Sequence, residues 1–248
     1  MKHSAAFTLI ELLVALVVIT MLVAGLALPI SAQVQLRRQD ETRRTLEEAR
    51  EALLGFAAGA ARLPCPATAT SHGEEAFAPG GDASNGRCAT FHDGWLPAAA
   101  LGLTPLDEAA FLRDAWGTRI RYAVFGDRPI EGVEHALTRA RGLQAATLPG
   151  LGAAPHYLII CASGQGLDAA SCGAAANQLT RRAAFVVFST GPNGGGIPGP
   201  DETHNLDGDG VFVSHTASQD PVNPFDDLVT WLPVPMLINR MIAAGHLP

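Results

Sequence analysis

The stretch A-A-F-T-L-I-E-L-L-V-A-L, from Ala5 to Leu16, decides how this chain is organised. It opens an apolar run from Phe7 to Ile30 that contains a single acid, Glu11. A helix that spans a bilayer needs about 20 apolar residues, so the run predicts a transmembrane helix. A carboxylate inside such a helix costs roughly 2.5–3.5 kcal/mol on insertion scales. We therefore expect Glu11 to have a function and a partner of opposite charge.

The residues around Glu11 resemble the N-terminal cleavage and methylation signature of type IV pilins and type II secretion pseudopilins. In that family a short basic leader is removed just before the Phe, and the new N-terminal amine is methylated. The acid then pairs with the amine of a neighbouring subunit during assembly. The resemblance implies cleavage between Ala6 and Phe7, methylation of Phe7, and assembly through Glu11. Where the family usually has Gly before the cut, this chain has Ala6, which is also small.

The resemblance also implies a location and a set of partners. Residues 1–6 would be the leader and residues 7–30 the transmembrane and assembly helix. Lys2 and His3 precede the apolar run, so the positive-inside rule favours a cytoplasmic start. The expected partners are other pilin-like subunits, as homo- and heteropolymers, with prepilin peptidase and an inner-membrane assembly platform. The expected location is a single pass of the bacterial inner membrane with the C-terminal domain in the periplasm, assembled into a periplasmic or surface filament.

Two other interpretations of the N-terminus stay open. Residues 1–32 could be a secretory signal peptide with Ala32 before the cut, although the run exceeds an h-region of about 7–15 residues and contains Glu11. A plain signal-anchor helix would explain the length of the run but not the acid. The alternative function is then a membrane-anchored or secreted, calcium-stabilised binding protein that does not polymerise.

Composition and motifs narrow the functional class. The formal net charge is −7 and the isoelectric point is about 5.6. Since general nucleic-acid binding requires a basic face, no nucleic-acid partner is expected. The sequence contains no nucleophile elbow, no zinc-protease motif and no phosphate-binding loop. It therefore predicts that the chain is not an enzyme.

The four cysteines indicate two disulfides in an exported domain. They are Cys65, Cys88, Cys161 and Cys172. The sequence alone allows three pairings. We favour Cys65–Cys88 and Cys161–Cys172, because each pair brackets a polar, Gly-rich loop. Zinc is disfavoured because there is no C-x-x-C and the histidines are not clustered near the thiols.

The chain after the apolar run predicts an α+β fold of pilin-like layout. Residues 31–63 have the periodicity of an amphipathic helix that extends the membrane helix and ends at Pro64. Pro29 would kink the helix, as membrane helices tolerate. Residues 64–248 would form the globular domain, with little regular structure before about residue 110. The helix would pack on a small antiparallel sheet.

Three strands are predicted in this domain, and their succession along the chain favours an antiparallel meander. They lie within Asp114–Phe125, His156–Ser163 and Ala184–Thr190. The first is preceded by D-A-W-G, which looks like the strand-opening motif of pseudopilins, in which the Trp packs against the long helix. That role would fall to Trp116. Met236–Gly245 could form a short helix under the sheet.

The loop after the third strand is the best candidate for binding chemistry. Asn205, Asp207 and Asp209, followed by Gly, match the first half of a D-x-[DN]-x-[DN]-G calcium loop. Thr216 stands where an EF-hand requires Glu, so further ligands would come from Asp201, Glu202, Asp220, Asp226 or Asp227. The resemblance supports calcium, since major pseudopilins carry a calcium loop in the same place. The alternative is a metal-free turn, because D-G is an ordinary turn dipeptide.

Overall fold

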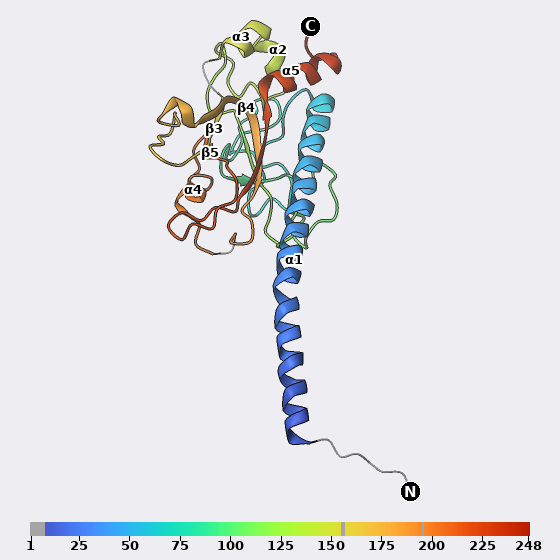
Figure 1. Cartoon of the computed structure of the whole chain (residues 1–248). Coiled ribbons are helices and arrows are strands. Elements are labelled where there is room, and N and C mark those ends of the chain that lie inside the picture. The colour runs from blue at the N-terminus through green and yellow to red at the C-terminus, as the bar shows by residue number, and fades with distance from the viewer. Residues whose placement is uncertain (1–7, 155–156, 195) are drawn as a thin grey trace. The chain divides into compact units, whose positions relative to one another are not determined.

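The computed structural model describes residues 8–154, 157–194 and 196–248, without the side chains of residues 22–31. The chain divides into two compact units, Met1–Glu41 and Thr42–Pro248. The helix α1 (Leu9–Ala60) contributes residues to both units (Figure 1). The backbone stays helical through Pro29. The helix ends at Ala60, shortly before Pro64, where the sequence predicted its end.

The first unit consists of the N-terminal part of α1. Thr8 and Glu11 form a capping box at its start, in which each side chain accepts the backbone N–H of the other. The large apolar side chains that follow are exposed, among them Leu9 at 84% and Met21 at 72%. Over the residues that the structure describes, no helix is both long and apolar enough to cross a bilayer. Phe7, the first residue of the predicted span, lies outside those residues.

In the second unit the remainder of α1 buries one face. Leu46, Ala49, Leu53 and Ala57 are almost fully buried at three- and four-residue spacing, so they form one stripe of the helix. Glu48 and Glu51 are exposed. From Leu46 to Ala57 the helix therefore has the amphipathic character that the sequence predicted. Burial of such a stripe stabilises the unit by roughly 25 cal/mol per Å² of apolar surface.

A six-stranded sheet forms the centre of the second unit (Figure 1). Its main order is β1-β2-β4-β3-β5, and β6 also pairs with β4. All pairs are antiparallel except the parallel pair of β3 and β5. The strands are β1 (Gly94–Trp95), β2 (Arg121–Val124), β3 (Leu158–Cys161), β4 (Gln178–Ser189), β5 (Val211–Val213) and β6 (Leu228–Pro233).

The predicted meander is wrong, because β2 and β3 are not paired with each other and both pair with β4. β4 has 12 residues. Its first half pairs with β3 and its second half with β2, so one long strand joins both. The chain between β2 and β3 forms α2 (Gly142–Ala145) and α3 (Leu148–Ala153) instead of a tight hairpin. Because this long segment separates β2 from β3, the two strands do not form a hairpin and each pairs with β4 instead.

The main core lies between the sheet, the buried stripe of α1 and the C-terminal helix α5 (Val234–Ala243). Tyr122, Phe185 and Phe188 are among its largest fully buried side chains. Leu237 and Met241 of α5 add to the same cluster, so the predicted C-terminal helix is confirmed and packs into the domain. The remaining elements are the short α4 (Pro200–Thr203) and the 3-10 turn η1 (Ala175–Asn177). The α+β class is confirmed.

The region between α1 and β2 has little regular structure, as predicted, and is held by covalent and charged links. The disulfide Cys65–Cys88 closes part of it. Beside it Arg62 pairs with Glu75 through two bonds of 2.7 and 2.8 Å, and Glu75 also accepts the N–H of Cys65 at 3.0 Å. A buried, bidentate pair of this kind fixes a loop because either charge alone would be costly to bury.

The second disulfide, Cys161–Cys172, ties the end of β3 to the following loop. Its two cysteines are buried in a small separate cluster with Ile159 and Val211. Both disulfides thus have the pairing that the sequence favoured.

Candidate functional site

The sequence placed the assembly chemistry at the start of the chain. Ala6 and Phe7, the predicted cleavage and methylation site, lie outside the described residues. Glu11 lies in the first turn of α1, where its carboxylate is favoured by the helix dipole. Its Oε2 accepts from the N–H and the hydroxyl of Thr8, each at 3.4 Å. These bonds are long, so the carboxylate keeps most of its capacity for a stronger partner.

The D-A-W-G turn is organised by its first residue. Asp114 is 7% exposed. It accepts the N–H of Trp116 at 2.9 Å, and its other oxygen accepts the hydroxyl of Ser189 at 2.6 Å. Ala115 donates its N–H to Thr42 of α1 at 3.2 Å. Trp116 itself is half-buried, and the hydrogen bond of Ala115 links its turn to α1.

Three carboxylates meet between α4 and the segment before β6. Glu202 comes from α4, and Asp226 and Asp227 precede β6. One oxygen from each lies within 4.8 Å of the others. Glu202 is 1% exposed and Asp227 is 5% exposed. Several acidic oxygens in one buried place are the donor set of a hard cation such as Ca²⁺.

Short hydrogen bonds hold Glu202 in this place. Its Oε2 accepts from Asn193 Nδ2 and from the N–H of Gly199, both at 2.7 Å. Its Oε1 accepts from the N–H of Asp226 at 2.6 Å. Gly191 follows β4 with φ +61°, and a Cβ there would collide with Asp226 Oδ1. The glycine is therefore required for the loop to approach the carboxylate.

The cluster is electrostatically strained. Burial, and then the charge of Glu202, raises the pKa of Asp226 to about 6. Burial also raises the pKa of Asp227 to about 7, to which the charges of Glu202 and Asp226 add, while the bond from Asn205 lowers it. Asp226 Oδ1 is buried without a hydrogen-bond partner. An orphaned carboxylate oxygen beside two other acids fits a cation, because a divalent ion would supply the missing partner and offset the repulsion.

The three residues of the predicted calcium motif have other partners. Asn205 is 2% exposed, and its Nδ2 donates to Asp227 Oδ2 at 2.7 Å. Asp207 is exposed and its Oδ1 accepts the N–H of Asp209 at 3.1 Å. The structure therefore gathers Glu202, Asp226 and Asp227, which the sequence offered as additional ligands, and brings only Asn205 of the motif to them. In the sequence only their acidic side chains pointed to these three residues, because Glu202 lies far from Asp226 and Asp227 along the chain.

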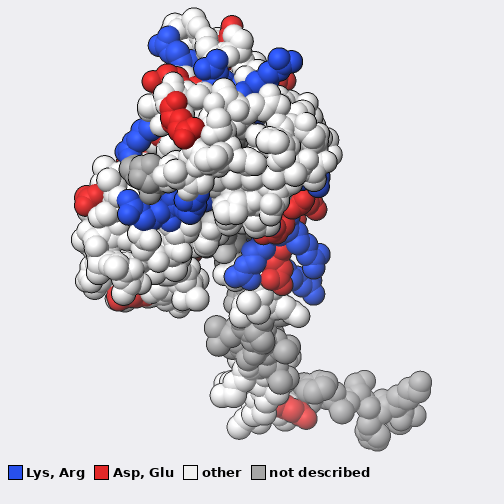
Figure 2. Space-filling view, turned by 90° about the horizontal axis from the view of Figure 1, so that it is seen from above, with Lys and Arg blue, Asp and Glu red and all other residues white. Residues whose placement is uncertain are grey.

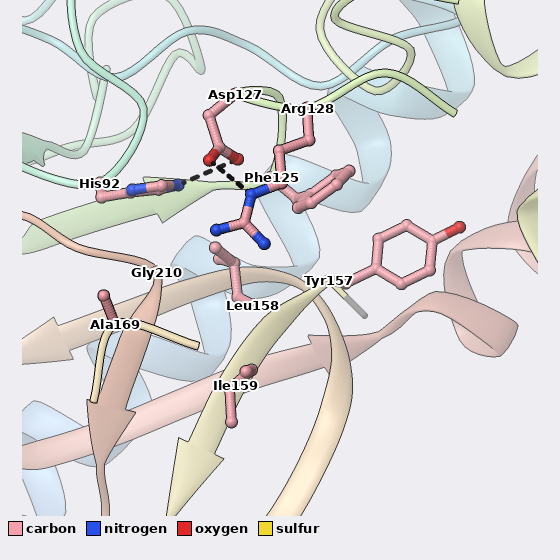
Figure 3. A pocket seen from close by; sticks show the side chains of 9 residues that line it. All are labelled: His92, Phe125, Asp127, Arg128, Tyr157, Leu158, Ile159, Ala169 and Gly210. Carbon is pink, nitrogen blue, oxygen red and sulfur yellow. Dashed lines mark ion pairs between the residues drawn. The ribbon is translucent and has the colours of Figure 1, made fainter. Parts of the chain in front are cut away.

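A small pocket lies elsewhere in the second unit, between the end of β2 and the start of β3 (Figure 3). His92 and Arg128 point toward Asp127, at 3.5 and 3.4 Å from its oxygens (Figure 3). Burial alone would raise the pKa of Asp127, but the nearby imidazole of His92, with Arg128, holds it below its usual value. Phe125 and Tyr157 form apolar walls. Since Asp127 is already paired with His92 and Arg128, the lining of this pocket does not point to a reaction.

The surface shown in Figure 2 carries small groups of both signs, separated by uncharged side chains. On that face of the described chain neither sign forms a continuous field. The face thus has the mixed character of an ordinary solvated surface.

Comparison with known proteins identifies the N-terminal motif. A family model described as the prokaryotic N-terminal methylation motif matches residues 1–27. No curated protein and no solved structure gives a significant match to the chain. Residues 1–27, including Phe7 and Glu11, therefore carry the signature of type IV pilins and pseudopilins.

Proposed function

We propose that this chain is a pilin-like structural subunit of a type II secretion pseudopilus or a type IV pilus. The observation that carries the proposal is the methylation motif at residues 1–27, with Glu11 in the first turn of a continuous helix. Prepilin peptidase would cut between Ala6 and Phe7 and methylate the new amine of Phe7.

Assembly follows from the physics of the N-terminal unit. Its exposed apolar side chains require lipid or the helices of other subunits around them. Before assembly, residues 7–30 would anchor the subunit in the inner membrane. In the filament, Glu11 would face the methylated amine of a neighbouring Phe7. A carboxylate is costly in an apolar medium when alone but tolerable when paired with an ammonium.

The globular unit would lie in the periplasm. The two disulfides support an oxidising compartment. The part of α1 from Thr42 packed on an antiparallel-rich sheet supports a pilin-like layout. Its long irregular loops favour a minor subunit, since a major subunit repeats many times and needs a compact, regular body. Partners would be other pilin-like subunits and the inner-membrane assembly platform.

We further propose a structural Ca²⁺ site at Glu202, Asp226 and Asp227. The orphaned Asp226 Oδ1 and the repulsion between the three buried acids support it. The ion would link α4 to the segment before β6 and so join two loops that are distant in sequence. Its role would be to stabilise the domain, without chemistry on a substrate.

Fractionation of the native host tests the proposed function. Filaments are sheared or extracted, separated from membranes, and probed for this chain and for the other pilin-like subunits. The chain should co-purify with those subunits. A chain that stays dispersed in membranes or medium while filaments form would instead support the non-polymerising binding protein.

A further inference from the structure

The outer edge of the sheet at β5 shows how the N-x-D-x-D-G motif is used. β5 ends the main strand order and pairs in parallel with β3. Ile159 donates its N–H to the carbonyl of Gly210, and Ser214 donates its N–H to the carbonyl of Cys161. In a parallel pair, alternate residues bond to the same neighbour. The N–H groups of Val211 and Val213 therefore point outward, where a further strand would bind.

Two side chains of the motif occupy these outward positions. Asp209 Oδ1 accepts the N–H of Val211 at 2.8 Å. Asn205 Oδ1 accepts the N–H of Val213 at 2.7 Å, and Asn205 Nδ2 donates to the carbonyl of Val213 at 3.1 Å. The amide of Asn205 thus makes the pair of bonds that a residue of a neighbouring strand would make.

The loop that carries both side chains lies directly before β5 in the chain, so it folds back along the strand. Asn205 is held from behind by its 2.7 Å bond to Asp227. Asp207 lies between the two. It accepts the N–H of Asp209 at 3.1 Å and lies 3.4 Å from Nδ1 of His204, and neither of these partners belongs to β5. Of the three polar residues of the motif, Asn205 and Asp209 therefore bond to β5.

The geometry points to loop 205–209 as a strap that closes the β5 edge against strand addition by a second copy of this chain. Unpaired edges of apolar strands are templates for pairing with another chain. β5 reads V-F-V and is fully buried, with Val211 at 2% and Val213 at 0% exposure. An opened edge would thus present β-branched residues and free donors together, to which the same edge of a second copy is the nearest match.

The test uses the detergent-solubilised full chain with Asp209→Ala, Asn205→Ala and the double variant. Asp207→Ala is the matched control, because it changes an acid of the same turn that does not bond to β5. Hydrogen exchange resolved to single amides should accelerate about tenfold or more at Val211 in Asp209→Ala and at Val213 in Asn205→Ala. Asp207→Ala should leave both amides protected. Sedimentation over a concentration series should show self-association of the double variant only.

A third variant separates edge pairing from general exposure. Adding Val211→Pro to the double variant removes the outward N–H, as proline does on natural edge strands. Self-association should then fall back toward that of the unchanged chain. Self-association that persists after Val211→Pro would overturn the strap. So would a double variant that keeps both disulfides, stays monomeric and shows unchanged hydrogen exchange. If the double variant does not fold, slow exchange at Val211 in Asp209→Ala would overturn it instead.

Discussion

Glu11 Oε2 accepts both the backbone N–H and the hydroxyl of Thr8, each at 3.4 Å, while Thr8 Oγ1 accepts the N–H of Glu11 at 3.3 Å. The acid of the methylation motif thus also sets the first turn of α1. If the chain is cut before Phe7, its new amine lies one residue from this capping box. The carboxylate then has a weak partner in its own chain and a stronger one in a charged amine from a neighbour.

Substitution of Glu11 should separate assembly from helix capping. Glu11→Gln keeps an acceptor for Thr8 but loses the charge, so the filament fraction should fall at least about tenfold, which corresponds to 1.4 kcal/mol. Thr8→Val removes only the cap and should reduce assembly far less. The measurement is the ratio of the chain in sheared filaments to that in membranes. Glu48→Gln, an exposed acid further along α1, is the control. Normal assembly of Glu11→Gln would rule out the pairing with an amine.

The acid cluster predicts an unusual pH dependence of stability. Asp227 has a native pKa of about 7, above its ordinary value of 3.8. The folded state therefore binds more protons than the unfolded state between these values, so stability without divalent cations should fall as pH rises from about 4 to about 7. Because Ca²⁺ would bind the charged form, adding it at the higher pH should restore the loss. Urea unfolding with and without chelator measures both effects.

Asp227→Asn tests whether this cluster is the cause. The variant removes one buried charge, so it should be more stable than the unchanged chain at pH about 8 without Ca²⁺, by an amount on the order of 1–2 kcal/mol. It should also lose most of the response to Ca²⁺. Asp220→Asn, at an exposed turn, should leave both properties unchanged. An equal Ca²⁺ response in Asp227→Asn would remove this residue from the proposed site.

Asp114 should be a main support of the second unit. Its carboxylate accepts Trp116 N, Thr118 N and Ser189 Oγ at 2.9, 2.8 and 2.6 Å. Asp114→Ala leaves these donors without their acceptor in a buried place, which should cost about 3 kcal/mol or more of unfolding free energy. Asp168→Ala removes a similar turn at an exposed site and should cost less than about 1 kcal/mol. Equal losses in the two variants would contradict this role.

The sequence predicted those features that depend on local pattern. The amphipathic part of α1 follows from the spacing of Leu46, Ala49 and Leu53, and the disulfide pairing from the loops that the cysteines bracket. The strand order was missed because it depends on β4 pairing with three other strands, and alternation within a strand does not specify its neighbours.

The sequence named the residues of the acid cluster only among several possible additional ligands, for a related reason. Glu202 and Asp226 meet only because Asp226 N donates to Glu202 Oε1 across two loops. In contrast, Asn205 and Asp209 have the residue types of calcium ligands but bond to the edge of β5. Asx side chains bind backbone N–H groups as readily as cations, so a short motif cannot distinguish the two uses.

The most direct test of the central claim is mass spectrometry of the intact chain and its N-terminal peptide from the native host. Lys2, in the predicted leader, is the only lysine of the chain. A chain cut before Phe7 would therefore have no lysine amine, and amine-directed tags would report on its N-terminus alone. The mature chain should begin at Phe7 and carry one added methyl group. A chain that begins near Gln33, or one that retains Met1 in cells with active prepilin peptidase, would contradict it.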